Sequence, residues 1–400
     1  MTSNTAQEAQ LAALLKKVAS ASDLVLGYPV SKDFDYSPLY EFLQYPINNL
    51  GDPFVDSTFK VHTHCIERQV IGFFAKMFRA NPKDYWGYVT NGGSESNLYG
   101  LYVARELYPQ AMVYFSESTH YSVKKNIHLL NIPSIMIRSQ ENGEIDYTDL
   151  ENTLQYNRQK PAIILTSFGT TMKEAKDDVS KVKNILKKLA IQDHYIHCDA
   201  ALSGSYGAFI KPHIPFDLRD GADSISISGH KFIGSPIPSG VLITRRSLRD
   251  RIAKGISYIG SLDTTISGSR NGHAPLFLWY AIQQVGMEGF RTRYEHSLSV
   301  AEYCKKELIK IGVDAWSNPG AITVVFPRVA AALKEKWQLA TEEVTHIICM
   351  PNVTKAQIDE FIQDMILEQA TVDSEGKTDD FMEGVAYEKE NEQFSYLNAF

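Results

Sequence analysis

Short apolar runs recur between Trp86 and Thr244, and stretches with helical spacing separate several of them. The runs cover residues 86–90, 111–115, 134–137, 162–167, 195–198, 224–228 and 240–244, and the helical stretches cover 94–107, 120–130 and 178–191. Strands that alternate with helices indicate an α/β fold with a mainly parallel sheet covered on both faces. In such sheets, ligands bind beyond the carboxyl ends of the strands.

Two helices and an irregular segment are expected before this region. Residues 8–19 and 66–79 carry apolar positions at helical spacing. The segment from Leu26 to Phe59 is rich in Pro, Gly, Asp and aromatic residues, which is typical of an irregular covering arm.

The last third of the chain has a different pattern. A long helix is expected from about Pro275, followed by the apolar runs AITVVFPR and THIICMP and by a helix near 355–368. This order indicates a smaller α+β domain. We therefore predict an N-terminal helix and arm (1–60), a large α/β domain (61–270), a small domain (271–368) and an acidic, mobile tail (369–400).

Composition argues against a nucleic-acid-binding, membrane-spanning or secreted protein. A net charge of −7 argues against a nucleic-acid partner, which favours a basic face. No apolar stretch is long enough to cross a bilayer, and the lysines near the N-terminus follow the apolar run, the reverse of a secretory signal. Four scattered cysteines (Cys65, Cys198, Cys304, Cys349) indicate reduced thiols. We expect a cytoplasmic protein.

The segment Thr90–Asn97 (TNGGSESN) follows an apolar run and opens a helix. Glycines allow backbone N–H groups to approach an anion, and a helix N-terminus adds free donors and a favourable dipole. Ser94 is either the helix cap or a hydroxyl donor to phosphate. The segment lacks the Lys and Ser/Thr of a phosphate-binding P-loop, and a capped helix after a Gly turn explains it equally well.

Lys231 lies in SISGHKFIG, also at the end of an apolar run. Desolvation there would lower the pKa of the lysine and make its amine nucleophilic toward aldehydes. Ser228 and His230 would add donors to a phosphate. The alternative is an exposed loop lysine.

Asp199 in HCDAA and His120 in SESTHYSV complete the set of strand-end residues. A buried carboxylate needs a cationic partner, and a protonated pyridine nitrogen is one. The imidazole of His120 is flat enough to stack on such a ring. The alternatives are an N-cap aspartate and a capping or surface histidine.

Six short motifs occur in the chain in the same order as in a known family of enzymes, and this series is far more specific than any single motif. They are TNGGSESN, SESTHYSV, SFGTTMKEAKDD, HCDAALSG, SGHKFIGSP and TTISGSRNGHAP, spread over about residues 24–355. The chain resembles the group II amino acid decarboxylases that depend on pyridoxal phosphate (PLP), which have the fold-type I, aminotransferase-like architecture. Within that family it is most similar to the bacterial PLP-type histidine decarboxylases and the plant serine decarboxylases.

The resemblance implies roles for individual positions. Lys231 would form the Schiff base with the cofactor, Asp199 would pair with its pyridinium nitrogen, and His120 would stack on one face of the ring. Ala201 would pack on the other face. The phosphate contacts would be Gly93, Ser94, Ser228 and His230, and Thr170 would lie near the ring oxygen.

The segment after Lys231 matches the family pattern with a different spacing. Family members have a mobile loop here, with a tyrosine that delivers a proton to the substrate carbon, and Tyr258 is the best match. The spacing of Tyr258 from Lys231 differs from that of the animal enzymes. Residues 264–270 are expected to reach the active site of a neighbouring subunit in a homodimer.

His62 and His64 lie on one face of an extended segment and suggest a metal site at first sight. Because the spacing offers no further ligand, we predict no metal. Contact with the substrate or with the arm is the preferred role, and Tyr28 in the LGYP turn is a further candidate for substrate contact.

The resemblance implies an enzyme that removes the α-carboxylate of an amino acid as CO2. L-Histidine, giving histamine, is the first choice of substrate, and L-serine is the alternative. A PLP aminotransferase or lyase, and a non-catalytic protein that has kept the fold, remain open as other classes.

Overall fold

The computed structural model describes residues 2–56, 58–256 and 261–375. The chain divides into two compact units, Met1–Thr354 and Lys355–Phe400. The described part of the second unit is helix α10 (Lys355–Glu375), which extends beyond the end expected near residue 368. From residue 376 on, the predicted acidic tail lies outside the described residues. All further elements belong to the first unit.

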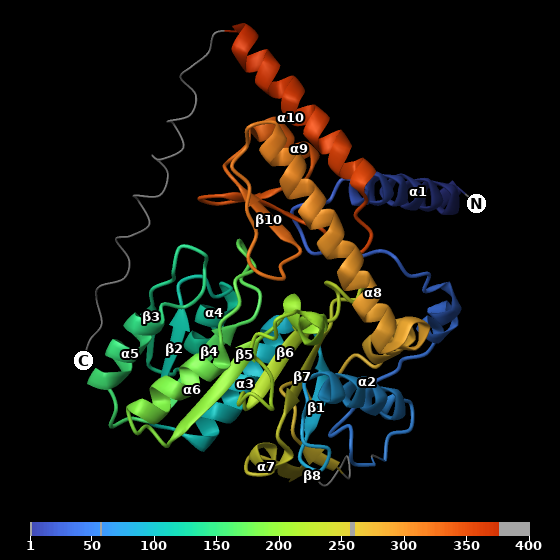
Figure 1. The fold of residues 1–400 in the computed structure, drawn as a ribbon. Coiled ribbons are helices and arrows are strands. Elements are labelled where there is room, and N and C mark those ends of the chain that lie inside the picture. Colours follow the sequence, from blue (N-terminus) through green and yellow to red (C-terminus); the bar gives the residue numbers. More distant parts are fainter. Residues whose placement is uncertain (1, 57, 257–260, 376–400) are drawn as a thin grey trace. The chain divides into compact units, whose positions relative to one another are not determined.

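Seven strands form the central sheet of the first unit, in the order β1-β7-β6-β5-β4-β2-β3 (Figure 1). They are β1 (Trp86–Thr90), β2 (Met112–Ser116), β3 (Ser134–Ile137), β4 (Ala162–Ser167), β5 (His194–Asp199), β6 (Ser224–Ser228) and β7 (Gly240–Thr244). Only β7 runs antiparallel to its neighbours, β1 and β6. The seven apolar runs are therefore strands, and the prediction of a mainly parallel α/β sheet is confirmed.

The first unit also contains helices, several of which pack on this sheet. They are α1 (Thr2–Ser22), α2 (His64–Met77), α3 (Gly93–Leu107), α4 (Ser122–Leu129), α5 (Tyr147–Tyr156), α6 (Val179–Lys188), α7 (Arg246–Arg249), α8 (Ala274–Lys310) and α9 (Ala331–Lys336). Short 3-10 helices lie at Ser37–Gln44, Ser203–Ser205 and Gly207–Phe209, the first of them within the predicted arm.

The core lies on both faces of the sheet because successive strand residues point in opposite directions. In β4, Ile163 and Leu165 pack into a cluster with α3 and α4, whereas Ile164 packs with α5 and α6 on the other face. Both faces are thus buried, which explains why β4 reads as a continuous apolar run instead of an alternating one.

A smaller antiparallel sheet has the order β10-β12-β11, with β10 (Thr323–Phe326), β11 (Ala340–Thr341) and β12 (Thr345–Ile348). Strands β8 (Lys254–Ile256) and β9 (Ser261–Asp263) form a separate ribbon. Glu174, in the loop after β4, accepts hydrogen bonds from the Ile322 N–H (2.9 Å) and the Thr323 hydroxyl (2.7 Å). This buried carboxylate joins the small sheet to the large one. The domain boundaries expected at residues 60, 270 and 368 stay predictions.

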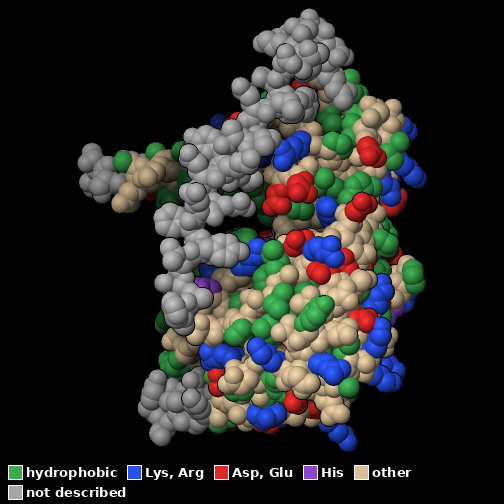
Figure 2. Space-filling view, turned by 90° about the vertical axis from the view of Figure 1, so that its left-hand side faces the viewer, with side chains coloured by type: hydrophobic (Ala, Val, Ile, Leu, Met, Phe, Trp, Pro, Cys, Tyr) green, Lys and Arg blue, Asp and Glu red, His purple; other side chains and the backbone are tan. Residues whose placement is uncertain are grey.

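The surface carries charges of both signs. On the face shown in Figure 2, Lys and Arg side chains are interspersed with Asp and Glu. None of the helices within the described ranges combines the length and the apolar character needed to span a bilayer.

A core substitution tests this packing. Leu165→Ala should lower the free energy of unfolding by about 2–5 kcal/mol, because the fully buried side chain leaves a cavity. The matched control is Leu129→Ala on the surface of α4, where the leucine is 65% exposed and the expected change is within about 0.5 kcal/mol. Urea denaturation measures both, and equal effects would contradict the assigned core.

Candidate functional site

A cavity of about 820 Å³ opens beyond the carboxyl ends of the parallel strands. Its wall brings together ten of the residues singled out in the sequence: Tyr28, Gly93, Ser94, His120, Thr170, Asp199, Ala201, Ser228, His230 and Lys231. They come from separate loops that follow β1, β2, β4, β5 and β6 and from the N-terminal arm. The residues of the strand-end motifs therefore lie together in one cavity, as the sequence predicted.

One end of the cavity is formed by the start of α3. Gly92 has φ 146°, and no side chain caps the helix, so the backbone N–H groups of its first turn have no intrahelical acceptors. A Cβ atom at Gly93 would lie 2.7 Å from the Ser228 Oγ. A glycine at this position leaves room for the Ser228 hydroxyl beside the start of α3, and the free backbone donors together with this hydroxyl form a cradle suited to an anion.

Asp199 ends β5 and is 7% exposed. Its Oδ2 accepts from the Asn97 amide at 2.6 Å, and its Oδ1 accepts from the Ala201 N–H at 3.1 Å. Both carboxylate oxygens thus accept a hydrogen bond from an N–H group. Among the described residues, Asp199 forms no salt bridge, so its charge is available to a cationic group in the cavity.

Lys231 follows β6 and is partly buried. Burial lowers the pKa of its amine, and the charge of Asp199 opposes this shift. No hydrogen bond or ion pair within the described part of the chain involves the amine. An amine with a lowered pKa and no partner is suited to attack a carbonyl carbon.

His120 precedes α4, and its Nδ1 lies 2.8 Å from the Ser122 hydroxyl and 3.3 Å from the Ser122 N–H. Because that N–H donates, Nδ1 is the acceptor and Nε2 carries the proton. Burial lowers the pKa of His120, Asp199 raises it, and Lys231 lowers it further. These opposing influences show that the three groups share one electrostatic environment, and the ring is neutral at pH 7.

Thr170 and His230 are each fixed by a backbone contact. The Thr170 hydroxyl accepts from the Ala175 N–H at 2.9 Å, which leaves its own proton to donate. His230 Nδ1 lies 3.0 Å from the Ser239 carbonyl oxygen, so Nε2 is the ring nitrogen left for a ligand. Both side chains are thus held ready to contact a ligand in the cavity.

The opposite wall was not predicted. It includes Leu339 and residues of β11 and β12 from the small sheet, next to Tyr28 of the arm. His346 of β12 lies 3.0 Å from the Gly27 carbonyl and 3.1 Å from the Met172 carbonyl. Burial lowers the pKa of His346, and the neutral ring donates to one of these carbonyls at a time. It fastens the arm beside the loop after β4.

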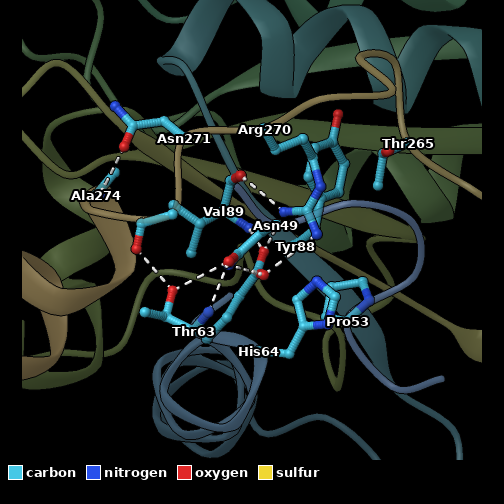
Figure 3. A network of polar contacts seen from close by, with 12 residues as sticks. Asn49, Pro53, Thr63, His64, Tyr88, Val89, Thr265, Arg270, Asn271 and Ala274 are labelled. Atoms are coloured by element: carbon cyan, nitrogen blue, oxygen red, sulfur yellow. Dashed lines mark hydrogen bonds and ion pairs between the residues drawn. The ribbon is translucent and has the colours of Figure 1, made fainter. Parts of the chain in front are cut away.

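His62 and His64 do not line this cavity. Their rings stack at 4.3 Å beside a buried network shown in Figure 3. In that network Arg270 forms an ion pair with Glu67, and Glu67 also accepts from Asn49 Nδ2 at 2.7 Å. No group of three or more His, Cys, Asp or Glu side chains in the described residues is arranged to hold a metal.

The segment 264–270 belongs to the same network. Thr264 and Arg270 are buried, whereas Gly268 and Ser269 are exposed. Arg270 is fixed by Glu67 and by the Gly51 carbonyl at 3.0 Å, so the exposed middle of the segment is the part that can reach another molecule. Tyr258 lies outside the described residues.

Sequence comparison identifies relatives along most of the chain. The family described as "Pyridoxal-dependent decarboxylase conserved domain" matches residues 41–326. A histidine decarboxylase of Mesorhizobium japonicum is 48% identical over 88% of this chain and 95% of the relative. A histidine decarboxylase of Vibrio campbellii is 43% identical over 86% of this chain and 90% of the relative.

The fold has a close match among solved structures. The L-methionine decarboxylase of Streptomyces sp. 590, in complex with 3-methylthiopropylamine, superimposes with a TM-score of 0.82 and 25% identity. The match covers 90% of this chain and 95% of that chain.

Two buried histidines predict a pH dependence of stability. Burial lowers the pKa of His64 and of His197 from 6.5 to about 4. Below pH 6.5 the unfolded chain therefore binds protons that the folded chain does not, and stability is lost as the pH falls toward 4. Between pH 7 and pH 5 each histidine should cost about 2 kcal/mol.

Urea denaturation of His64→Gln at the two pH values should show a loss smaller by about 2 kcal/mol than in the wild type. The matched control, His128→Gln on the exposed face of α4, should keep the wild-type loss. If His64→Gln lost as much stability between pH 7 and pH 5 as the wild type, His64 would bind its proton equally in the folded and the unfolded chain, and its pKa would not be lowered.

Proposed function

Because the chain belongs to the pyridoxal-dependent decarboxylase family, we propose that it converts L-histidine to histamine and CO2. Pyridoxal phosphate is the cofactor, and the enzyme is a carboxy-lyase. The observation that carries the choice of histidine is the 48% identity, over 95% of its length, to a relative with that activity.

The cavity has three features that fit pyridoxal phosphate. The cradle at Gly93 and Ser228 suits a phosphate, the buried carboxylate of Asp199 suits a protonated ring nitrogen, and the unpaired amine of Lys231 suits an aldehyde. The ring would lie between His120 and Ala201. In this proposal Ser94 and His230 add phosphate contacts, and Thr170 donates to the ring oxygen.

When bound, pyridoxal phosphate supplies a conjugated ring that takes up the electrons released as the carboxylate leaves. Asp199 favours this electron flow by keeping a proton on the ring nitrogen, since its ionised oxygens need a cationic partner in a site of low polarity. His120 contributes a flat, neutral face.

Lys231 has two tasks in the proposed mechanism. Its amine would hold the cofactor aldehyde in the resting enzyme, and the substrate amine would take its place there until the product leaves. Freed during the reaction, the amine is also placed to return a proton to the α-carbon. Tyr258 is the second candidate for this proton transfer, on the basis of the family resemblance.

The composition of the cavity wall favours loss of the carboxylate over amino-group transfer. Aminotransferases typically bind the α-carboxylate with an arginine, and none occurs among the described residues that line the cavity. L-Serine is the alternative substrate, because the related plant enzymes share the motifs. Tyr28 is the proposed contact to the substrate side chain, and His62 and His64 would have to contribute from outside this cavity.

We further propose a homodimer in which the exposed part of 264–270 reaches the neighbouring site. The support is the exposure of Gly268 and Ser269 between two buried anchors, Thr264 and Arg270.

The described cysteines form no disulfide, which supports the cytoplasm as the compartment.

Replacing the lysine tests the cofactor assignment. Lys231→Ala should abolish the visible absorbance of the bound cofactor and lower turnover by roughly 10⁴-fold or more. Lys188→Ala, on the surface of α6 where the side chain is 68% exposed, is the matched control and should retain both. A yellow, active Lys231→Ala enzyme would refute the assignment.

A panel of amino acids tests the substrate. CO2 release from L-histidine should proceed with a kcat/KM at least about a hundredfold above that for L-serine. A pocket that hydrogen-bonds the imidazole would leave its polar groups unpaired when the smaller serine side chain binds. Preferential turnover of serine, or formation of a keto acid without CO2, would point to one of the alternatives.

A further inference from the structure

A chain of polar side chains leads from Asp199 through Asn97, which also lines the cavity, to buried residues that do not line it. Asn97 Nδ2 donates to Asp199 Oδ2 at 2.6 Å, and Asn97 Oδ1 accepts from the Ser226 hydroxyl at 2.5 Å. Asn97 Oδ1 also lies 2.9 Å from His197 Nε2, and His197 Nδ1 lies 2.6 Å from the Ser224 hydroxyl. We call Asn97, His197, Ser224 and Ser226 the relay. All four side chains are at most 2% exposed.

With a neutral His197 ring, the hydrogen-bond roles in the relay admit one arrangement. The Ser226 hydroxyl donates to Asn97 Oδ1, which fixes the amide with its NH2 group toward Asp199. His197 Nε2 must then donate to the same oxygen, and its Nδ1 accepts from the Ser224 hydroxyl. This is the tautomer of a neutral imidazole, and burial lowers the pKa of His197 to about 4.

The helix backbone is adapted to this arrangement. A Cβ atom at Gly100, one turn after Asn97 in α3, would lie 2.3 Å from His197 Nδ1. The glycine therefore makes the space that the imidazole occupies between α3 and β5. Apolar side chains could fill the same space without the risk of leaving a buried polar group unpaired. The presence of an amide, an imidazole and two hydroxyls here therefore suggests a role beyond packing.

A neutral relay has a specific electrostatic consequence. Asn97 can donate a hydrogen bond to Asp199 but cannot give it a proton, and neutral His197 adds no positive charge. The other titratable groups that interact with Asp199 are His120 and Lys231, which line the cavity, and the buried thiol of Cys198, whose pKa is raised by burial so that it stays neutral. The negative charge of Asp199 is thus preserved and directed toward the cavity.

We propose that Asn97 and His197 are positioning residues that keep Asp199 ionised and aimed at the ring nitrogen of the cofactor. The inference rests on the proposed function, in which Asp199 pairs with that nitrogen. It makes Asn97→Asp the most informative substitution. This variant keeps the size of the side chain but places a second acid against Asp199, so that the two must share a proton.

The experiment compares reconstituted variants by cofactor affinity, by the pH dependence of the visible cofactor absorbance, and by kcat and KM. Asn97→Asp should weaken cofactor binding by roughly tenfold or more and displace the absorbance titration, with kcat lowered about ten- to a hundredfold and KM changed little. Asn152→Asp, an exposed position on α5, is the matched control and should match the wild type.

Two further variants separate positioning from folding. His197→Gln, which retains an N–H donor, should keep more of the cofactor affinity than His197→Leu. Ser226→Ala removes one of the two donors to Asn97 Oδ1 and should lower the cofactor affinity roughly threefold. This variant tests the relay even if Asn97→Asp folds poorly. Asn97→Asp or Ser226→Ala with lower thermal stability but unchanged affinity and absorbance titration would overturn the proposal.

Asp199→Asn distinguishes this inference from the proposed function. If it also leaves cofactor affinity and the absorbance titration unchanged, the pairing of Asp199 with the ring nitrogen is wrong. If Asp199→Asn changes them and the relay variants do not, only the positioning role fails.

Discussion

A carboxylate buried at the carboxyl end of β5 constrains the rest of the cavity. Burying an ionised acid is unfavourable unless hydrogen bonds and a cation compensate for the lost water. Asn97 and the Ala201 N–H supply the hydrogen bonds to Asp199, but no described side chain supplies a salt bridge. The structure therefore leaves the charge to be balanced by a cationic ligand. In the proposed function, the protonated ring nitrogen of pyridoxal phosphate is that cationic group.

The fold collects the other groups around that charge. Parallel strands end at the same edge, so the loops after β2, β5 and β6 bring His120, Asp199 and Lys231 together although 111 residues separate the first from the last. The proposed phosphate cradle lies at the start of α3, and residues of the small sheet line another part of the cavity wall. Glu174 connects the two sheets, so the large-sheet edge and the wall that faces it are held together.

Much of this arrangement follows from local sequence. Strands buried on both faces give continuous apolar runs, and five of the seven, such as Trp86–Thr90, have the predicted bounds. Helix α5 was missed because Leu150 and Leu154 are its only buried positions, too few for a periodic pattern. The antiparallel course of β7 depends on pairing with distant strands and has no local signal.

The site was predicted less completely where contacts are non-local. Asn97 lies inside a recognised motif, but its role appears only when α3 is packed against Asp199 and Ser226, 102 and 129 residues away in the sequence. His346 and the small-sheet wall follow the last motif in the sequence and reach the cavity only through the tertiary fold. His62 and His64, expected near the substrate, lie outside the described cavity wall, and no spacing rule could have shown this.

In the proposed function, the amine of residue 231 carries the cofactor opposite the acid at 199. Borohydride reduction of the purified protein, followed by peptide mapping, tests it most directly. The account predicts a single pyridoxyl group, attached to the peptide that contains Lys231. A modification on another lysine, or none at all, would contradict it.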